Sequence, residues 1–234
     1  MQRMNAESQP STRRLILVPA VITLAVTLLR LVGELNHWAG AWFTTGMGAS
    51  VVGIVWLAPA FGVYFALQLS ASGKAPNAAW RALAFAALGI AVAIIMTRGF
   101  TIGAIAPRLH LSYTFHTRLL YGWSVMGVAA VATLPGWPAL FQTLLAYAYA
   151  ARVPVAIIMF FAYHGHWGTH YDAVPPDFPA RMSLASTWLW MAFFPQLVFW
   201  VGFTVVSGML FGSVAVALVS FLRSLAPLLA RRSD

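Results

Sequence analysis

Long apolar runs separated by short polar segments are the dominant pattern along this chain. A helix that crosses the hydrocarbon layer of a membrane needs about 20 mainly apolar residues, and several runs approach or exceed that length. Apolar residues follow one another without alternation, which favours helices over the strands of a β-barrel. The runs cover residues 15–32, 43–69, 79–96, 119–133, 139–163 and 184–230. The pattern predicts an all-α fold, a polytopic transmembrane helix bundle.

The last run, 184–230, is too long for one span, because a helix rises about 1.5 Å per residue and the hydrocarbon layer is about 30 Å thick. We therefore divide it near Val206 and Ser207, which gives seven spans; leaving it undivided gives six as the alternative. Gly208 and Gly212 form a GxxxG spacing in this run, which favours close packing of helices within the chain. Residues 1–14 are expected to be a disordered tail, and 15–230 a single transmembrane domain.

Composition supports the membrane interpretation and excludes other classes. The chain is 61% hydrophobic and only 8% charged, whereas soluble domains carry about 25% charged residues. The net charge of +9 comes mainly from arginines placed singly at run ends, where they anchor helices among lipid headgroups. The expected partners are therefore the lipid bilayer and other membrane subunits, and not nucleic acid. The chain has no cysteine, which excludes disulfides and iron–sulfur clusters.

Basic residues near the first spans indicate an orientation. Arg13, Arg14, Lys74 and Arg81 lie on the side of the N-terminus. The positive-inside rule then favours a cytoplasmic N-terminus, and we expect the chain to lie in a bacterial inner (cytoplasmic) membrane.

All histidines fall in three alternate connections between the runs, at 33–42, 97–118 and 164–183. Alternate connections of a membrane bundle lie on the same side, so the sequence predicts one histidine-rich face. The histidines are His37, His110, His116, His164, His166 and His170.

The densest polar segment, HGHWGTHYD at 164–172, is a candidate metal site. His164, His166, His170 and Asp172 share one parity, so an extended chain would point them to one face. Imidazole and carboxylate groups are ligands for Zn, Fe or Mn ions. The alternative is that these residues only border the lipid headgroups.

Glu34 and His37, at the end of the first run, form a Glu-x-x-His spacing that could add ligands to the same mononuclear site. The competing interpretation is an ion pair between Arg30 and Glu34, which are i, i+4 neighbours on a helix.

Two further features are candidates for ligand binding. Polar residues alternate with apolar ones from 109 to 116, so we expect an extended segment with His110 and His116 on one face, either a lid or a packed loop. Arg152 lies deep in the fifth run, two residues before Pro154. A buried arginine needs neutralisation or hydration. We expect it to face the bundle and line a polar pocket, with Glu34, water, freed carbonyls or an anionic ligand as its partner; the alternative is a lipid anchor.

Three classes of function fit these residues. The first is a membrane enzyme or redox subunit with one divalent metal ion on the histidine face. The second is a carrier or channel for a small or anionic solute that uses Arg152. The third is a structural or accessory membrane subunit. No P-loop or dinucleotide fingerprint is present in the sequence.

Overall fold

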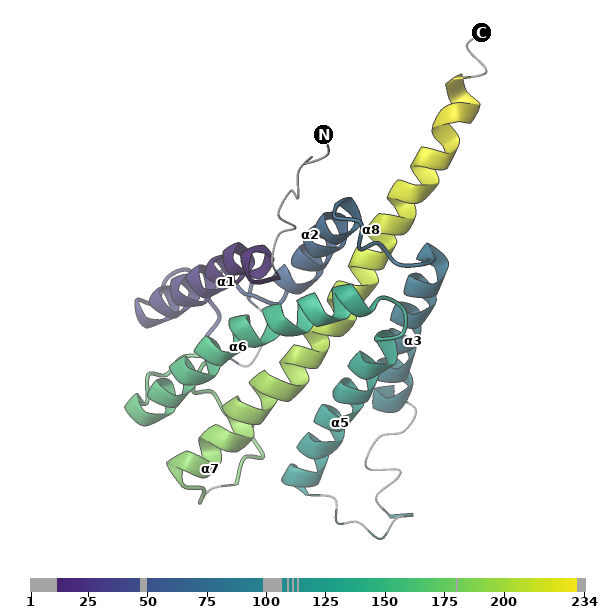
Figure 1. The fold of residues 1–234 in the computed structure, drawn as a ribbon. Helices are drawn as coiled ribbons and strands as arrows, with labels where there is room; N and C mark the ends of the chain where they lie inside the picture. Colours follow the sequence, from purple (N-terminus) through teal and green to yellow (C-terminus); the bar gives the residue numbers. More distant parts are fainter. Residues whose placement is uncertain are drawn as a thin grey trace, which may run out of the picture.

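A computed structural model describes residues 12–46, 50–98, 107–108, 110, 112, 114–179 and 181–230, and these residues contain helices and turns but no strand. Most of the described residues are helical (Figure 1). The elements are α1 (Thr12–Leu35), α2 (Leu57–Ala71), α3 (Ala79–Arg98), α5 (Phe115–Thr133), α6 (Pro138–Gly165), α7 (Leu184–Trp188), the π-helical segments η1 (Leu189–Phe193) and η2 (Pro195–Trp200), and α8 (Val201–Ala230).

Four of these stretches are long and apolar enough to cross a membrane, as expected for a multi-pass membrane protein. They are Arg13–Leu35, Ala79–Thr97, Pro138–Gly165 and Leu184–Leu225. α2 is apolar but shorter, at 15 residues. Apolar runs therefore predicted these helices with ends displaced by a few residues, except for α2, which begins well inside its run.

Two sequence predictions need correction. The division near Val206 and Ser207 is wrong, because both residues lie inside the uninterrupted α8, so seven spans are not supported. The proposed tail ends too late, because Thr12 already belongs to α1; residues 1–11 lie outside the described part. The second span was expected within residues 43–69; α2 begins at Leu57, after bends and turns at 50–56.

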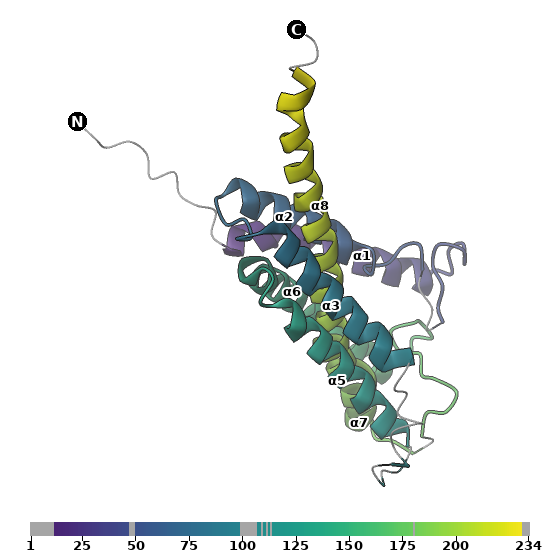
Figure 2. The same ribbon diagram turned by 90° about the vertical axis from the view of Figure 1, so that its right-hand side faces the viewer.

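The connections that carry the histidines lie at one end of the bundle. α3 and α6 end there, and α5 and α7 begin there, in the lower part of Figure 1, and α1 ends at the left of the same view. α8 passes α2, α3, α5 and α6, and its last turns extend beyond them at the other end (Figure 2). One long helix therefore supports most of the others, and the histidine end is opposite its C-terminus.

Glycines allow α2 and α8 to approach closely. A Cβ atom on Gly62 would lie 2.4 Å from Gly208 Cα, and one on Gly212 would lie 2.7 Å from the Gly62 carbonyl oxygen. The GxxxG spacing thus serves packing within the chain, as the sequence indicated.

Two buried clusters fill the bundle. The larger joins α2, α6 and α8 through Phe65, Leu144 and Met209. The smaller lies near the histidine end, where Leu31 and Met159 pack with Tyr171. Met159 and Tyr171 of the smaller cluster also line the cavity that is described in the next subsection.

Wide π turns interrupt the last helix at η1 and η2. Pro195 has no N–H to donate and cannot continue a regular α-helical ladder, and π turns accommodate such positions. The wide turns direct Gln196 and Trp200 toward α6, where both meet Arg152.

Candidate functional site

Histidines lie at the C-terminal ends of two of the helices that lead to the site. His37 follows α1 with φ 51°, and Trp38 N donates to the Gly33 carbonyl at 2.9 Å. His166 caps α6 in the same left-handed conformation, with φ 51°. This arrangement is the Schellman type of helix end, and histidine is among the residues that tolerate it better than most. Both positions therefore have a structural role in the backbone.

Glu34 ties the end of α1 to the 166–173 loop. It is 1% exposed and accepts a hydrogen bond from Arg30 Nε at 2.6 Å. It also accepts from the backbone N of His170 at 2.8 Å and from its Nδ1 at 2.9 Å. The pair that the sequence offered as the alternative, Arg30 with Glu34, is present, and His170 joins it.

The hydrogen bond to Glu34 sets the tautomer of His170. An ionised carboxylate only accepts, so Nδ1 must carry a proton and Nε2 of the neutral ring is left as an acceptor. Burial lowers the pKa of His170 below its usual value, and the charge of Arg30 lowers it further; together they outweigh the opposing effect of Glu34. His170 is therefore neutral at pH 7, an arrangement that suits a proton acceptor.

Asp172 is committed to its own loop. Its carboxylate accepts from Gly168 N at 2.9 Å and from Thr169 N at 2.7 Å. The neighbouring residue Tyr171 binds the loop to α1, because its hydroxyl donates to the Thr27 carbonyl at 2.8 Å. The loop is thus fixed by side chains at both ends, and it holds His170 in place.

The predicted metal ligands do not assemble. Among the residues that the structure describes, no group of three or more His, Cys, Asp or Glu side chains could hold a metal ion. Of the candidates, Glu34 and His170 meet, whereas His37, His164 and His166 are exposed. The parity argument required an extended chain, in which alternate residues point to one face. The chain is not extended here, because His164 belongs to the last turn of α6 and the backbone turns sharply at His166.

The 109–116 segment is described only in part, because residues 109, 111 and 113 lie outside the described residues. His110 is exposed. His116 belongs to the first turn of α5, not to an extended segment, because Thr114 caps the helix. The His116 ring contacts Trp190 with centroids 4.4 Å apart, so the structure gives His116 a packing contact with η1.

Arg152 is 4% exposed and faces the bundle interior, as the sequence predicted. Its Nη1 donates to Gln196 Oε1 at 3.3 Å, and its guanidinium lies 5.0 Å from the centre of the Trp200 ring. Glu34, the partner proposed from the sequence, is instead bound to Arg30 and His170. Within the described part of the chain, no carboxylate forms an ion pair with Arg152.

A cavity of about 470 Å³ connects these groups. We call it the arginine cavity, defined by Arg30, Arg118, Arg152, His170, Gln196 and Trp200. Its volume is in the range of small-molecule sites, about 300–1,000 Å³. The lining combines three guanidinium groups with apolar and aromatic walls, which is suited to an anionic ligand with an apolar part.

Sequence reasoning missed three members of this lining. Gln196 follows Pro195 inside an apolar run, and an amide beside a helix-breaking residue was the available signal. Trp200 gave no signal, because tryptophans are common in this chain. Arg118 is one of the arginines at the ends of apolar runs, which the sequence assigned only to anchoring at lipid headgroups. In the structure it lines the cavity and pairs with Asp177 at 2.5 Å.

Comparisons with models of known protein families, with curated proteins and with solved structures found no match. The class of the protein is therefore defined by its own helices, which are long and apolar enough for a multi-pass membrane protein.

Proposed function

We propose that this protein is an integral membrane protein that binds an anionic ligand in the arginine cavity, as a carrier or receptor does. The observation that carries the proposal is Arg152, a buried cation whose described contacts are an amide and an aromatic ring. A charge at membrane depth costs at least about 2.5–3.5 kcal/mol on the mildest scale. An anion in the cavity would offset this cost.

The other two arginines differ from Arg152 in their charge balance. Arg30 is paired with buried Glu34, and Arg118 with the half-exposed Asp177. The neutral state of His170 adds no charge. The excess positive charge of the cavity is therefore concentrated at Arg152, and that residue is expected to determine whether an anion binds.

We further propose six spans, formed by α1, α2, α3, α5, α6 and the continuous α7–α8 helix. Both ends of the described chain would then lie on one side, in the cytoplasm, with the arginine cavity nearer the other face of a bacterial inner membrane. Other membrane subunits remain proposed partners. A divalent metal site is not part of this proposal, since Glu34 and Asp172 are engaged with hydrogen-bond donors of the chain.

The experiment compares two arginine variants in detergent. Arg152→Gln removes the cavity charge, and Arg81→Gln removes the same charge from an exposed position on α3, outside the cavity. Inorganic phosphate is titrated at constant ionic strength, and the unfolding midpoint is measured. A bound ligand stabilises by about 2.7 kcal/mol at one hundred times its Kd.

We expect phosphate to raise the midpoint of the wild type and of Arg81→Gln, and not of Arg152→Gln. Equal stabilisation of the Arg152 variant, or no stabilisation of the wild type, would refute the proposal.

A second candidate function, a membrane enzyme acting on the same ligand, is favoured by the Glu34–His170 contact. A carboxylate that orients an imidazole is the arrangement by which many hydrolases prepare a base. His170 would take a proton from water as it attacks an ester of the ligand, and return it to the leaving oxygen. The test is product analysis by mass spectrometry after incubation with phosphatidic acid, comparing His170→Asn with the exposed His164→Asn; no turnover by the wild type would exclude this activity on that ester.

A further inference from the structure

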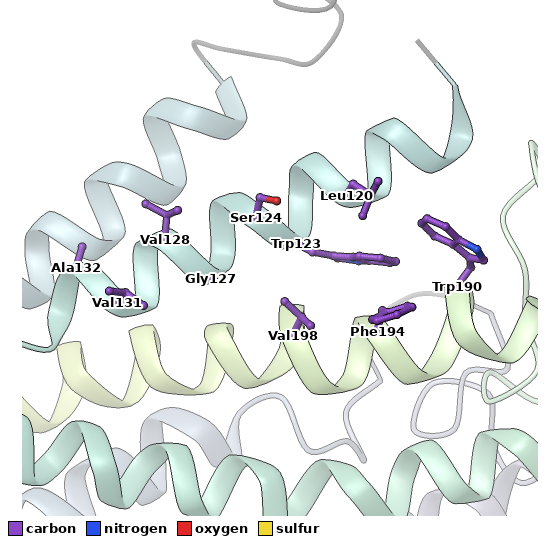
Figure 3. Close-up of a pocket in the computed structure, with 10 residues that line it drawn as sticks. All are labelled: Leu120, Trp123, Ser124, Gly127, Val128, Val131, Ala132, Trp190, Phe194 and Val198. Atoms are coloured by element: carbon purple, nitrogen blue, oxygen red, sulfur yellow. The ribbon is translucent and has the colours of Figure 1, made fainter. Parts of the chain in front are cut away.

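A second hollow lies directly beside the arginine cavity, between α5 and the π-helical segment. It has a volume of about 890 Å³, and we call it the aromatic groove, defined by Leu120, Trp123, Gly127, Val131, Trp190 and Val198 (Figure 3). Trp123 and Trp190 line both hollows, and their rings are stacked with centroids 5.4 Å apart. The two hollows therefore adjoin along this pair of rings.

The groove is apolar and faces outward. Among the described residues that line it, Ser124 carries the one hydroxyl group and the others are apolar or aromatic. Val128 and Val131 on α5 are 59% and 61% exposed, and on a membrane protein such positions face acyl chains. Gly127 leaves space in the middle of the groove, because a Cβ atom there would meet nothing within 4 Å. A hydrocarbon chain can therefore enter from the side, without passing through water.

Taken together, the two hollows have one charged end and one apolar end, as an amphiphilic ligand does. One end holds guanidinium groups, among them Arg152 without a described carboxylate partner. The described lining of the other end is apolar and aromatic apart from Ser124. Guanidinium groups bind phosphate through charge-assisted hydrogen bonds. A soluble anion would use the first hollow and leave the second without an occupant of matching chemistry.

We propose that the ligand is an anionic phospholipid, with its phosphate in the arginine cavity near Arg152 and one acyl chain along the aromatic groove. This inference rests on the proposed function and adds the class of ligand to it. The lipid enters laterally from the bilayer between α5 and η2, and the Trp123–Trp190 pair borders both its headgroup and its chain.

The experiment measures lipid retention by native mass spectrometry of protein released from nanodiscs. The nanodiscs contain phosphatidic acid and phosphatidylcholine in equal amounts with identical chains. Gly127→Phe fills the groove from a position that has room for a side chain, and Val131→Phe is a second variant at an exposed position. Ile157→Phe, 52% exposed on α6 and outside both hollows, is the matched control.

The wild type and Ile157→Phe should retain phosphatidic acid in preference to phosphatidylcholine by about tenfold, the effect of one additional hydrogen bond to a charged group. The phosphate monoester of phosphatidic acid has one more free oxygen for such a bond than the diester of phosphatidylcholine. Arg152→Gln should lose the preference. Gly127→Phe and Val131→Phe should lower retention of both lipids while phosphate still raises the unfolding midpoint, which also shows that these variants fold.

Three outcomes would overturn the inference. Unchanged retention in both groove variants would place the chain elsewhere, and equal retention of the two lipids by the wild type would remove the headgroup preference. A dimer that Gly127→Phe disperses would make the groove an interface between copies of the chain. In each case, stabilisation by phosphate that depends on Arg152 would leave the proposed function standing.

Discussion

Replacing Glu34 by glutamine should destabilise the protein far more than the loss of an exposed ion pair. Glu34→Gln keeps the shape of the side chain and one acceptor oxygen for Arg30. Its amide NH₂ group, however, would replace the oxygen that accepts from the backbone N of His170 at 2.8 Å, so two donors would face each other there. It would also leave Arg30, which is 7% exposed, without a countercharge.

The magnitude follows from the contacts that are lost. A hydrogen bond to a charged group contributes about 1.5–3 kcal/mol. The bond from the backbone N of His170 is replaced by a donor–donor contact, whereas the neutral His170 ring can still bond the amide by changing its tautomer. Breaking a buried ion pair by removing one partner costs about 3–5 kcal/mol. We therefore expect Glu34→Gln to lower the free energy of unfolding by about 3–5 kcal/mol.

Unfolding in mixed micelles with increasing SDS, followed by circular dichroism, measures the effect. Asp177→Asn is the matched control, because it removes one partner of the Arg118 pair, whose side chains are 41% and 50% exposed. Such a pair contributes about 0–1 kcal/mol. The double variant Arg30→Gln/Glu34→Gln should regain part of the loss, because no unpaired charge remains. The reasoning is refuted if Glu34→Gln costs no more than Asp177→Asn.

Three further predictions concern the same helices. The pKa of folded His170 lies below its usual 6.5, so the unfolded chain binds more protons below about pH 6.5. The free energy of unfolding should therefore fall as the pH drops below that value, with a smaller slope for His170→Asn. Gly62→Leu should lower the free energy of unfolding by about 1–3 kcal/mol or more, because its side chain would meet the Gly208 backbone. Gly127→Ala, where a Cβ atom has room, should not lower it and should raise it by up to about 1 kcal/mol. Equal losses in the two variants would contradict the packing argument. Tyr171→Phe should lose about 0.5–1.5 kcal/mol with its hydrogen bond to α1, measured by the same SDS titration, and an unchanged midpoint would count against that contact.

The helices could be predicted from the sequence because membrane spans need long apolar runs, and α1, α3 and α6 follow those runs closely. The length of α8 could not be predicted in this way. A limit set by bilayer thickness assumes that a helix stops at the membrane surface, whereas the last turns of α8 extend past its neighbours (Figure 2). The sequence also marks no start for α2, because residues 50–56 are as apolar as the helix itself.

Features of the candidate site could be predicted only where they depend on one residue and its position in the sequence. The burial of Arg152 follows from its depth in an apolar run. Its amide partner does not, because Gln196 reaches it only through the packing of η2 against α6. The histidines were grouped correctly at one end of the bundle. Which of them meets a carboxylate depended on the turn at His166, and no spacing rule encodes that turn.

The π turns of the last helix have a consequence for the register of its two halves. A wide turn is equivalent to one extra residue in an α-helix, and each residue rotates the helix by about 100°. Gly208 and Gly212 must face α2 while Gln196 and Trp200 face α6. The extra residues in η1 and η2 let the two halves meet these requirements independently. Deleting one residue within 189–200 would rotate one half of the helix relative to the other by about 100°, and it would force either the glycine contact or the Arg152 contact out of phase.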